Sequence, residues 1–543
     1  MIKLTPGRPV GTHVTGVLVE ARSPSNPTHR TLRDALISGG ASRPWVVFHK
    51  GVEQLAYTPF DIVTLASAWS TALEKAGVRP GDRVLVMLPN EASFLGAFFG
   101  ASFLGAVPVP TPWPFSMRTL DEVRAQLRPL IHVAAPTALV TSARYAGVAA
   151  LPTVVEPIES PRISIVGPTK PEAPAFIQFT SGTTSNPRGA VISENAAAES
   201  AFLMGEKLGL GPADIGVSWL PFFHDMGLVG ALFCSLVRRF TLHVSSPAEF
   251  LFRPRRWLEL VSLSRATITV GPNFAYELVA RRAEPEGLDL SSLRMALSGS
   301  EPVLRSTIDA FESRFAPSGI RRGTIVPVYG LAESTLGVCF ADRDSFRPDL
   351  TRPGRAPIPS VGTPLANTDV ELRDANGRPA PEGTEGEICV RGPTVMSGYF
   401  GDKEATHRTI RDGWLHTGDL GTSSNGQLYV TGREKDVVIK AGRKYHAEEL
   451  ELCVRNLFNG QSTGVAVFGI PNSAKGTEDL AVAVELKRRD ESYEDLVRST
   501  LLTALDVRAD VIRFVAPGAL PRTTSGKIRR RACLEALDEA SLA

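Results

Sequence analysis

The segment Thr180–Gly189, TSGTTSNPRG, places the strongest constraint on the fold of this chain. It follows the apolar run Ala175–Phe179, which predicts a buried strand, and precedes ENAAAESAFLMGEKLG, which predicts a helix. Its small residues allow backbone N–H groups to approach an anion, its hydroxyls add donors, and Arg188 adds charge. We therefore expect a loop that binds a nucleoside triphosphate tail, with a plain surface loop as the alternative. The expected contacts are Thr180, Ser181, Gly182, Thr183, Thr184 and Arg188.

The sequence matches neither of two other common active-site loops, the Walker loop and the nucleophile elbow. The pair Gly526-Lys527 is followed by Ile528 and has no glycine five residues before Gly526, so it is not a Walker loop. The segment LSGSEP, residues 297–302, lacks the G-x-S-x-G spacing of a nucleophile elbow. Nucleophilic serine hydrolysis is therefore a poor interpretation.

The apolar runs predict α/β architecture. Runs such as Arg83–Leu88 precede helical segments, as expected of partly parallel sheets. The stretch Ala92–Pro110 is apolar enough to suggest a membrane span, but it is rich in Gly, Ala and Ser and ends in a Val-Pro alternation that would break a helix. We interpret it as a buried helix followed by a strand, and we expect no membrane span.

The sequence pattern changes in the second half of the chain. Beyond about Ser360, TDVELRD, GEICVRG and GQLYVTG are short, alternating and bounded by turns, which predicts a small antiparallel β subdomain. From about Val437 the pattern is mixed α/β, with a helix near Ala447–Phe458 and a strand near Leu480–Leu486. The charged junction GREKD, Gly432–Asp436, is a candidate hinge.

We therefore predict an α/β fold of two domains. The large N-terminal domain, residues 1–432, would hold two α/β sheet subdomains and the small β subdomain. A hinge at 433–436 would connect it to a small α+β C-terminal domain, residues 437–543. The length of 543 residues is compatible with three or four lobes of roughly 150 residues each.

The net charge and the cysteines indicate which partners and which cellular compartment to expect. Lys and Arg total 59 against 57 Asp and Glu, and this net charge of +2 gives no electrostatic case for a nucleic-acid partner. Five scattered cysteines without a CxxC pair predict neither a disulfide framework nor a zinc site, and we expect buried thiols in a reducing compartment. The N-terminus lacks the apolar region of a signal peptide, so we expect a cytoplasmic protein.

Five further motifs follow the phosphate loop in a fixed order. They are SGSEPV (298–303), YGLAES (329–334), WLHTGDLG (414–421), GREKD (432–436) and LPRTTSGKIRR (520–530). With TSGTTSNPRG, this set resembles the adenylate-forming superfamily, which contains acyl-CoA synthetases, fatty acyl-AMP ligases and peptide-synthetase adenylation domains. The resemblance extends from roughly residue 30 to residue 535.

The resemblance implies ATP and Mg²⁺ as cofactors and assigns roles to individual residues. Tyr329 would stack on adenine, Asp419 with Arg433 would hold the ribose, and Glu333 would hold Mg²⁺, since a carboxylate oxygen suits a hard cation. Lys527 would neutralise charge on the carboxylate and the α-phosphate. The same motifs place Ser300, Glu301, Gly330 and Ser334 at the nucleotide and Gly299, Ala332, Phe223 and Phe274 at the acid.

The implied reaction has two steps. A carboxylate attacks the α-phosphorus of ATP, pyrophosphate leaves, and acyl-AMP forms. A thiol, from CoA or a carrier protein, then takes the acyl group and AMP departs. In the family the C-terminal domain swings between the steps, so the resemblance implies a mobile domain, a hinge at Lys435, and Gly442 at the mouth of a thiol tunnel.

Two segments favour the fatty acyl-AMP ligase branch. WLPFFHDMGLVG (219–230) and GPNFAYEL (271–278) resemble those enzymes, which load carrier proteins. Amino-acid-activating members of the superfamily usually place an Asp, which pairs with the substrate ammonium, where this chain has Phe274-Ala275; the resemblance therefore implies an acid without an α-amino group. His224 would border the acyl pocket near the reacting carboxyl, with a structural histidine as the alternative. The acid would be a medium or long fatty acid or a bulky hydrophobic acid of secondary metabolism.

Two features depart from that branch. Only Ser334–Ser360 separates YGLAES from VGTP, which is shorter than the usual insertion of these ligases, and the phosphate loop has Ser185 and Arg188 where Gly and Lys are usual. The acceptor therefore stays open between CoA and a carrier protein. Two other functions remain as alternatives: a non-thiol fate of acyl-AMP, as in luciferases, and a regulatory nucleotide-binding protein.

Overall fold

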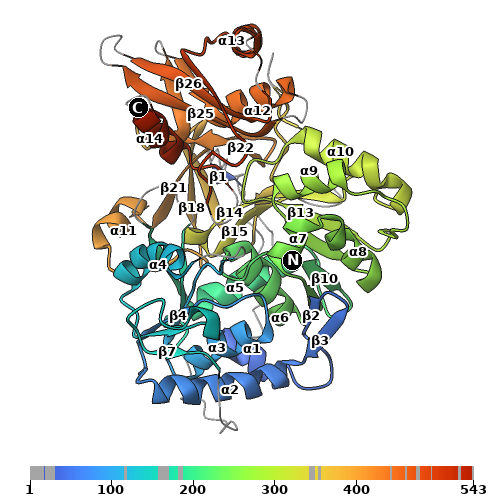
Figure 1. Ribbon diagram of the computed structural model, residues 1–543, viewed down its shortest axis with the longest axis vertical. Coiled ribbons are helices and arrows are strands. Elements are labelled where there is room, and N and C mark those ends of the chain that lie inside the picture. The colour runs from blue at the N-terminus through green and yellow to red at the C-terminus, as the bar shows by residue number, and fades with distance from the viewer. Residues whose placement is uncertain are drawn as a thin grey trace, which may run out of the picture.

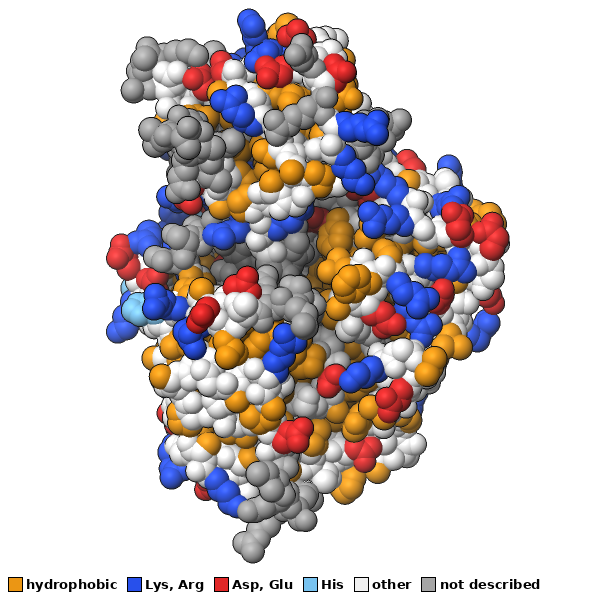
Figure 2. Space-filling view, viewed as in Figure 1, with side chains coloured by type: hydrophobic (Ala, Val, Ile, Leu, Met, Phe, Trp, Pro, Cys, Tyr) orange, Lys and Arg blue, Asp and Glu red, His pale blue; other side chains and the backbone are white. Residues whose placement is uncertain are grey.

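The structure is a computed structural model with a large N-terminal body and a small C-terminal lobe (Figure 1). It describes residues 17–18 and 31–540, apart from 115–118, 157–169, 181–186, 342–348, 352–355, 441–442, 459–461, 473–476, 489, 491 and 524–526. On the face in Figure 2 the surface is hollowed between the lobe and the body, and Lys and Arg side chains gather beside the hollow.

A nine-stranded sheet forms the centre of the body, in the order β16-β15-β14-β13-β12-β10-β11-β2-β3. The six strands from β14 to β2 are parallel, as expected of short apolar runs that alternate with helices. The strands are β2 (Val46–Lys50), β3 (Glu53–Tyr57), β10 (Ile215–Ser218), β11 (Thr241–Val244), β12 (Ile268–Gly271), β13 (Met295–Ser298), β14 (Ile325–Leu331), β15 (Leu336–Phe340) and β16 (Thr363–Pro364).

Helices surround this sheet. They include α1 (Leu32–Ile37), α5 (Glu194–Lys207), α6 (Cys234–Arg238), α7 (Pro247–Phe252), α8 (Arg255–Ser264), α9 (Asn273–Arg282) and α10 (Arg305–Phe315). The helix α4 (Leu120–Ala134) packs instead against a second sheet. The segment η2 (Met226–Phe233) is a π-helix that continues into α6, and such helices are frequent at functional sites.

A second, four-stranded parallel sheet has the order β5-β4-β6-β7. Its strands are β4 (Arg83–Val86), β5 (Val107–Pro110), β6 (Ala138–Val140) and β7 (Thr153–Val154). The apolar stretch predicted to be a buried helix and a strand is α3 (Ala92–Phe103) followed by β5, so that prediction is confirmed. A Cβ on Gly96 would lie 2.5 Å from the Trp69 ring of α2 (Pro59–Lys75), so the small residues of α3 permit close helix packing. Among the described helices, no segment is long and apolar enough to cross a membrane.

The phosphate loop lies in a β-hairpin. Strand β8 (Pro174–Phe179) pairs antiparallel with β9 (Gly189–Ser193), and β19 (Gly398–Tyr399) pairs with β9. The predicted strand–loop–helix order is therefore wrong by one element, because the short alternating run GAVIS forms β9 before α5 begins. Ser193 then caps α5 by accepting the N–H of Ala196.

The predicted antiparallel β subdomain is a six-stranded sheet. It has the order β1-β17-β18-β21-β20, and β22 also pairs with β21. Its strands are β1 (Val17–Leu18), β17 (Asp369–Arg373), β18 (Gly386–Arg391), β20 (Ile410–Arg411), β21 (Trp414–Ser424) and β22 (Gln427–Arg433), with α11 (Lys403–Thr409) alongside.

The C-terminal lobe has its own apolar cores. Both are made of residues between Val438 and Leu534, around the sheet β25-β26-β27 and the helices α12, α13 and α14. The predicted fold class is confirmed, while the domain boundary and the hinge stay predictions. The elements are β23 (Val437–Lys440), β24 (Arg443–His446), α12 (Ala447–Leu457), β25 (Ser462–Asn472), β26 (Thr477–Leu486), α13 (Ser492–Leu505), β27 (Val511–Val515) and α14 (Arg530–Ala540).

Candidate active site

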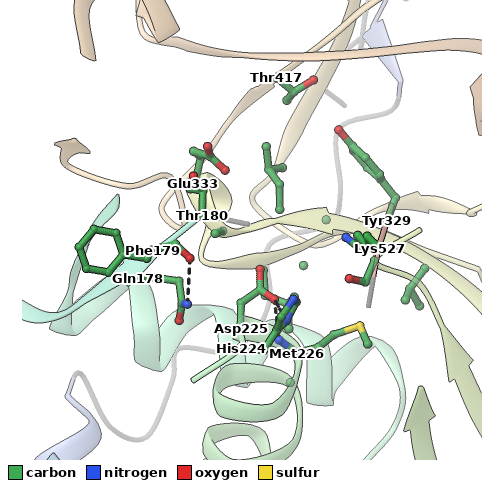
Figure 3. Close-up of a pocket in the computed structure, with 18 of the residues that line it drawn as sticks. Gln178, Phe179, Thr180, His224, Asp225, Met226, Tyr329, Glu333, Thr417 and Lys527 are labelled. Carbon is green, nitrogen blue, oxygen red and sulfur yellow. Dashed lines mark hydrogen bonds and ion pairs between the residues drawn. The ribbon is translucent and has the colours of Figure 1, made fainter. Parts of the chain in front are cut away.

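A cavity of about 730 Å³ lies between the body and the C-terminal lobe. One part is polar and includes Lys527, Tyr329, Glu333 and Thr180, which Figure 3 shows around a common space. The other part is apolar and extends between the large sheet and the helices α5, η2 and α6. Residues from all six predicted motifs line this cavity. The chain therefore brings distant motifs to one place.

Tyr329, Asp419 and Arg433 form a connected group in the polar part. The phenol of Tyr329 donates to Asp419 Oδ2 at 2.8 Å, and Arg433 Nε lies 2.6 Å from Asp419 Oδ1. The Asp419 charge raises the pKa of Arg433 against the effect of burial. The predicted adenine and ribose residues thus contact one another directly.

A β-bulge interrupts the pairing of β18 and β21 just before Asp419, whose neighbours Thr417 and Gly418 line the cavity. Glu387 pairs with Leu420 and Cys389 pairs with His416, so the bulge inserts two extra residues of β21 between these positions. Glu387 Oε1 accepts the N–H of Gly418 at 3.0 Å, and the Thr417 hydroxyl donates to the carbonyl of Ile388 at 2.7 Å. These two hydrogen bonds fix the bulged segment between His416 and Leu420 against β18.

Glu333 lies at the opposite side of the polar part, in the 3₁₀ turn η4 (Ala332–Ser334). Its Oε1 accepts a hydrogen bond of 2.8 Å from the Tyr399 hydroxyl. Burial raises the pKa of Glu333, and the Tyr399 bond only partly offsets this. A nearby cation would favour the ionised carboxylate.

The two ends of the phosphate loop, at Thr180 and Arg188, lie among the described residues. The N–H of Thr180 donates to the carbonyl of Arg188 at 3.0 Å, which closes the hairpin. The Arg188 guanidinium lies 5.3 Å from the centroid of the Tyr399 ring, so it faces the Glu333 side of the cavity. The predicted contacts Ser181, Gly182, Thr183 and Thr184 lie outside the described residues.

Lys527 reaches the cavity from the C-terminal lobe. Burial lowers the pKa of its ammonium group, as does the charge of Arg433, while Glu301, Asp225 and Asp419 act in the opposite direction. A substrate carboxylate or phosphate beside Lys527 would favour its charged form.

His224 and Asp225 lie in the cavity wall below Lys527 (Figure 3). His224 Nδ1 is 2.7 Å from Asp225 Oδ1, and Asp225 also accepts the N–H of Met226 at 2.7 Å. Burial raises the pKa of Asp225, but His224 and Lys527 outweigh it, so the pKa lies below its usual value. His224 therefore has a fixed orientation at the junction of the polar and apolar parts.

Of the other residues predicted to contact the nucleotide, Ser300 and Gly330 line the cavity, whereas Glu301 and Ser334 do not. Ser300 lines the cavity with φ +71, an uncommon backbone conformation of the kind that clusters at functional sites. Glu301, half-buried beside it, accepts the N–H of Phe274 in the first turn of α9 at 2.6 Å. Gly330 lines the cavity, and a Cβ there would lie 1.6 Å from the Leu336 carbonyl oxygen. Ser334 is buried beside Thr394, with 3.4 Å between the hydroxyl oxygens.

The predicted acid-binding residues divide between the cavity and the surrounding core. Phe223 and Ala332 line the cavity. The Phe274 ring instead packs edge-on to Trp219, with 6.3 Å between centroids, and Gly299 lies against Val328. The apolar part is lined by Met204, Leu208, Leu210, Val217, Ala231, Cys234, Phe240, Leu242, Ile268, Val270, Leu297, Val328, Leu336 and Phe340.

Of the two residues assigned to the domain movement, only Lys435 lies among the described residues. Lys435, in the turn η5 (Glu434–Asp436), lines the cavity between body and lobe, and burial lowers its pKa. Gly442 lies outside the described residues.

Three residues at the site were missed by sequence reasoning. Gln178 Nε2 donates to the Phe223 carbonyl at 2.9 Å, Tyr399 holds Glu333, and Asp225 orients His224. Asp225 could have been found from its position next to His224 in HDMG. Tyr399 gave no signal, because it lies 66 residues from Glu333.

Residues 40–400 match the family described as AMP-binding enzyme, and the chain belongs to this family. A curated relative is the long-chain-fatty-acid–AMP ligase FadD26 of Mycobacterium marinum, 35% identical over 84% of this chain and 87% of that protein. Another is the 4-hydroxyphenylalkanoate adenylyltransferase of Mycobacterium tuberculosis, 32% identical over 84% of this chain and 82% of that protein. A structure from a study of fatty acyl-adenylate ligases of E. coli and L. pneumophila has a TM-score of 0.86, at 29% identity, and covers 96% of this chain and 100% of that chain.

Proposed function

We propose that this protein activates a fatty acid with ATP, forms acyl-AMP with release of pyrophosphate, and passes the acyl group to a thiol. One observation carries the proposal: an apolar channel opens directly into a polar pocket that contains Lys527. A fatty acid in the channel would bring its carboxylate to the junction, beside His224, while a nucleotide occupies the polar part.

The chemistry requires positioning and charge neutralisation rather than a general base. The carboxylate oxygen attacks the α-phosphorus, the bond to pyrophosphate breaks, and a mixed anhydride forms. Lys527 would neutralise the charge that concentrates on the α-phosphate, and Arg188 would do so at the phosphate tail. Asp419 would hold the ribose, because its carboxylate is fixed by Tyr329 and Arg433.

Mg²⁺ fits the Glu333 side of the pocket. Glu333 offers a hard oxygen donor. Burial raises the pKa of this carboxyl group, and a cation beside it would act in the opposite direction by favouring the charged carboxylate. When bound, the ion would neutralise charge on the departing pyrophosphate. Tyr399 would keep the carboxylate oriented.

The acid is proposed to be a medium or long fatty acid. The channel lining consists of aliphatic and aromatic side chains from α5, η2 and strands β10–β15, which suits an alkyl chain. The relatives named for long-chain fatty acids and for 4-hydroxyphenylalkanoates support a hydrophobic carboxylic acid in general.

Thiol transfer would require Lys527 to leave the pocket. The lobe that carries Lys527 also contacts the body through His446 and Glu385, with 2.9 Å between Nε2 and Oε2. We propose that rotation at Lys435 breaks this contact and admits the thiol of CoA or of a carrier protein. The five cysteines are free thiols, which suits a reducing compartment such as the cytoplasm.

The test is to incubate the protein with ATP, Mg²⁺ and dodecanoic acid, with CoA, with a phosphopantetheine-bearing carrier protein, or with neither. Mass spectrometry would follow acyl-AMP and both thioesters. Acyl-AMP that persists with CoA but is consumed by the carrier protein would assign the carrier-protein branch, and rapid acyl-CoA formation would assign CoA. Absence of acyl-AMP across fatty acids from octanoic to hexadecanoic acid would overturn the proposal.

A further inference from the structure

Three side chains that commonly bind metals meet in the wall of the cavity. Cys389 on β18 lies directly opposite His416 on β21, and Glu387 lies two residues before Cys389 on the same face of the strand. His416 Nδ1 is 3.4 Å from Cys389 Sγ and 2.8 Å from Glu387 Oε2, and Sγ is 4.0 Å from Oε2. Among the described residues, this is the group of three whose ligand atoms lie within 4.8 Å of one another.

These distances are close to those of a tetrahedral zinc centre. Zn²⁺ binds a thiolate at ~2.3 Å and imidazole nitrogen or carboxylate oxygen at ~2.0–2.2 Å, which places neighbouring ligand atoms about 3.3–3.6 Å apart. The Sγ–Nδ1 distance of 3.4 Å already lies in this range. The other two distances need changes of about half an ångström, which side-chain rotation can supply.

The group is accessible to an ion from one side. Glu387 and His416 line the cavity, with side chains 22% and 8% exposed, and Cys389 is buried behind them. A water molecule from the cavity could complete four-coordination. Thiolate and imidazole favour Zn²⁺, whereas Mg²⁺ prefers oxygen ligands.

The charges around Glu387, Cys389 and His416 are compatible with a bound divalent cation. A thiolate and the Glu387 carboxylate would together balance Zn²⁺. Arg411 Nη2 is 3.9 Å from Glu387 and more than half exposed, while Arg373 is paired with Glu371 at 2.6 Å. Burial, followed by the Glu387 charge, raises the pKa of Cys389 to about 12, so an ion would have to displace the thiol proton into water.

We propose that Glu387, Cys389 and His416 form a Zn²⁺ site, and that an ion bound there inhibits the enzyme through the bulge that carries Asp419. The coupling is direct, because the second oxygen of Glu387 accepts the N–H of Gly418. Coordination of Glu387 would disturb this bond and the ribose-binding position of Asp419. The cysteine spacing predicted no zinc site, since these ligands come from two strands and His416 lies 27 residues from Cys389.

The first test measures metal binding in the full chain without ATP or acid. Equilibrium dialysis against Zn²⁺ should retain about one ion per wild-type chain, and Cys389→Ser and His416→Gln should each lose it. Cys453→Ser, which changes the half-buried thiol of α12, is the matched control and should keep the ion. Co²⁺ should give a thiolate charge-transfer band in wild type and not in Cys389→Ser. Failure of wild type to bind, or a band unchanged in Cys389→Ser, would show that the three side chains only hydrogen-bond to each other.

Thermal unfolding of the metal-free variants would establish that each is folded. If Cys389→Ser does not fold, His416→Gln decides the dialysis result. The inhibition experiment rests on the proposed function, whereas the binding experiment does not. In excess Mg²⁺, Zn²⁺ should inhibit acyl-AMP formation by wild type at a concentration at least tenfold below that needed for Cys389→Ser. Equal sensitivity would overturn the inhibitory role. A protein that binds zinc in dialysis but forms no acyl-AMP with Mg²⁺ in the absence of Zn²⁺ would overturn the proposed function alone.

Discussion

The hydroxyl of Tyr329 donates to Asp419 at 2.8 Å although the two residues lie 90 positions apart in the chain. Tyr329 belongs to the nine-stranded sheet, and Asp419 belongs to the six-stranded β subdomain. This bond therefore connects the two halves of the proposed nucleotide site. Its contribution can be measured separately from that of the aromatic ring.

We expect Tyr329→Phe to weaken ATP binding while the ring remains available for adenine. A hydrogen bond to a charged group contributes about 1.5–3 kcal/mol, and 1.4 kcal/mol corresponds to tenfold, so KM for ATP should rise roughly ten- to a hundredfold. Steady-state pyrophosphate release would measure it. Tyr276→Phe is the matched control, because this buried hydroxyl donates to the Leu297 carbonyl. An unchanged KM in Tyr329→Phe would contradict the assigned role.

Lys527→Ala should separate the two steps of the reaction. Loss of the ammonium group should reduce acyl-AMP formation by roughly 10²–10³-fold, because in the proposed reaction that charge would stabilise the α-phosphate during attack. Transfer from preformed acyl-AMP to a thiol should remain within a fewfold of wild type. Lys440→Ala is the control in the same lobe, since Lys440 pairs with Asp510. Equal loss in both steps would show that Lys527 acts differently.

Gly230→Leu should shorten the acyl channel. A Cβ at Gly230 would lie 2.9 Å from Leu336 Cδ2, and both residues line the cavity. We expect kcat/KM for hexadecanoic acid to fall at least tenfold relative to octanoic acid, because the longer chain needs the blocked space. Gly211→Leu, at a position where a Cβ meets no neighbour within 4 Å, is the control. A parallel loss for both acids would place the alkyl chain elsewhere.

Acid should destabilise the protein through His243. Its Nδ1 lies 2.9 Å from His49 Nε2, and burial, with the charge of His49, lowers the pKa of His243 to about 4. Between pH 6.5 and 4 the unfolded chain binds a proton at this residue that the folded chain does not, so the free energy of unfolding falls as pH falls in this window. The effect is at most about 3 kcal/mol.

The comparison uses chemical denaturation at several pH values. His243→Gln should reduce the slope of stability against pH below 6.5 and leave it unchanged above. His132→Gln, at an exposed position of α4, should retain the wild-type slope. A wild-type slope in His243→Gln would mean that other groups account for acid destabilisation.

Local patterns were sufficient to predict many of the elements. The alternation in GEICVRG and GQLYVTG predicted β18 and β22, and Ala92–Pro110 was predicted as a buried helix and a strand. The hairpin at the phosphate loop was not predicted. The five residues of β9 gain their stability from pairing with β8, and short-range periodicity does not record that pairing.

For the site, the sequence by itself was enough to predict which residues would carry the chemistry, because the motifs around Arg188, Tyr329, Asp419 and Lys527 are short and contiguous. Only the tertiary structure decided how they meet: Tyr399 beside Glu333, His416 opposite Cys389, and an apolar channel built from many separate elements. The physical reason is the range of the interactions. Propensity, turns and phosphate-binding loops are set by neighbouring residues, whereas strand register and cavity shape depend on packing between residues far apart in the chain.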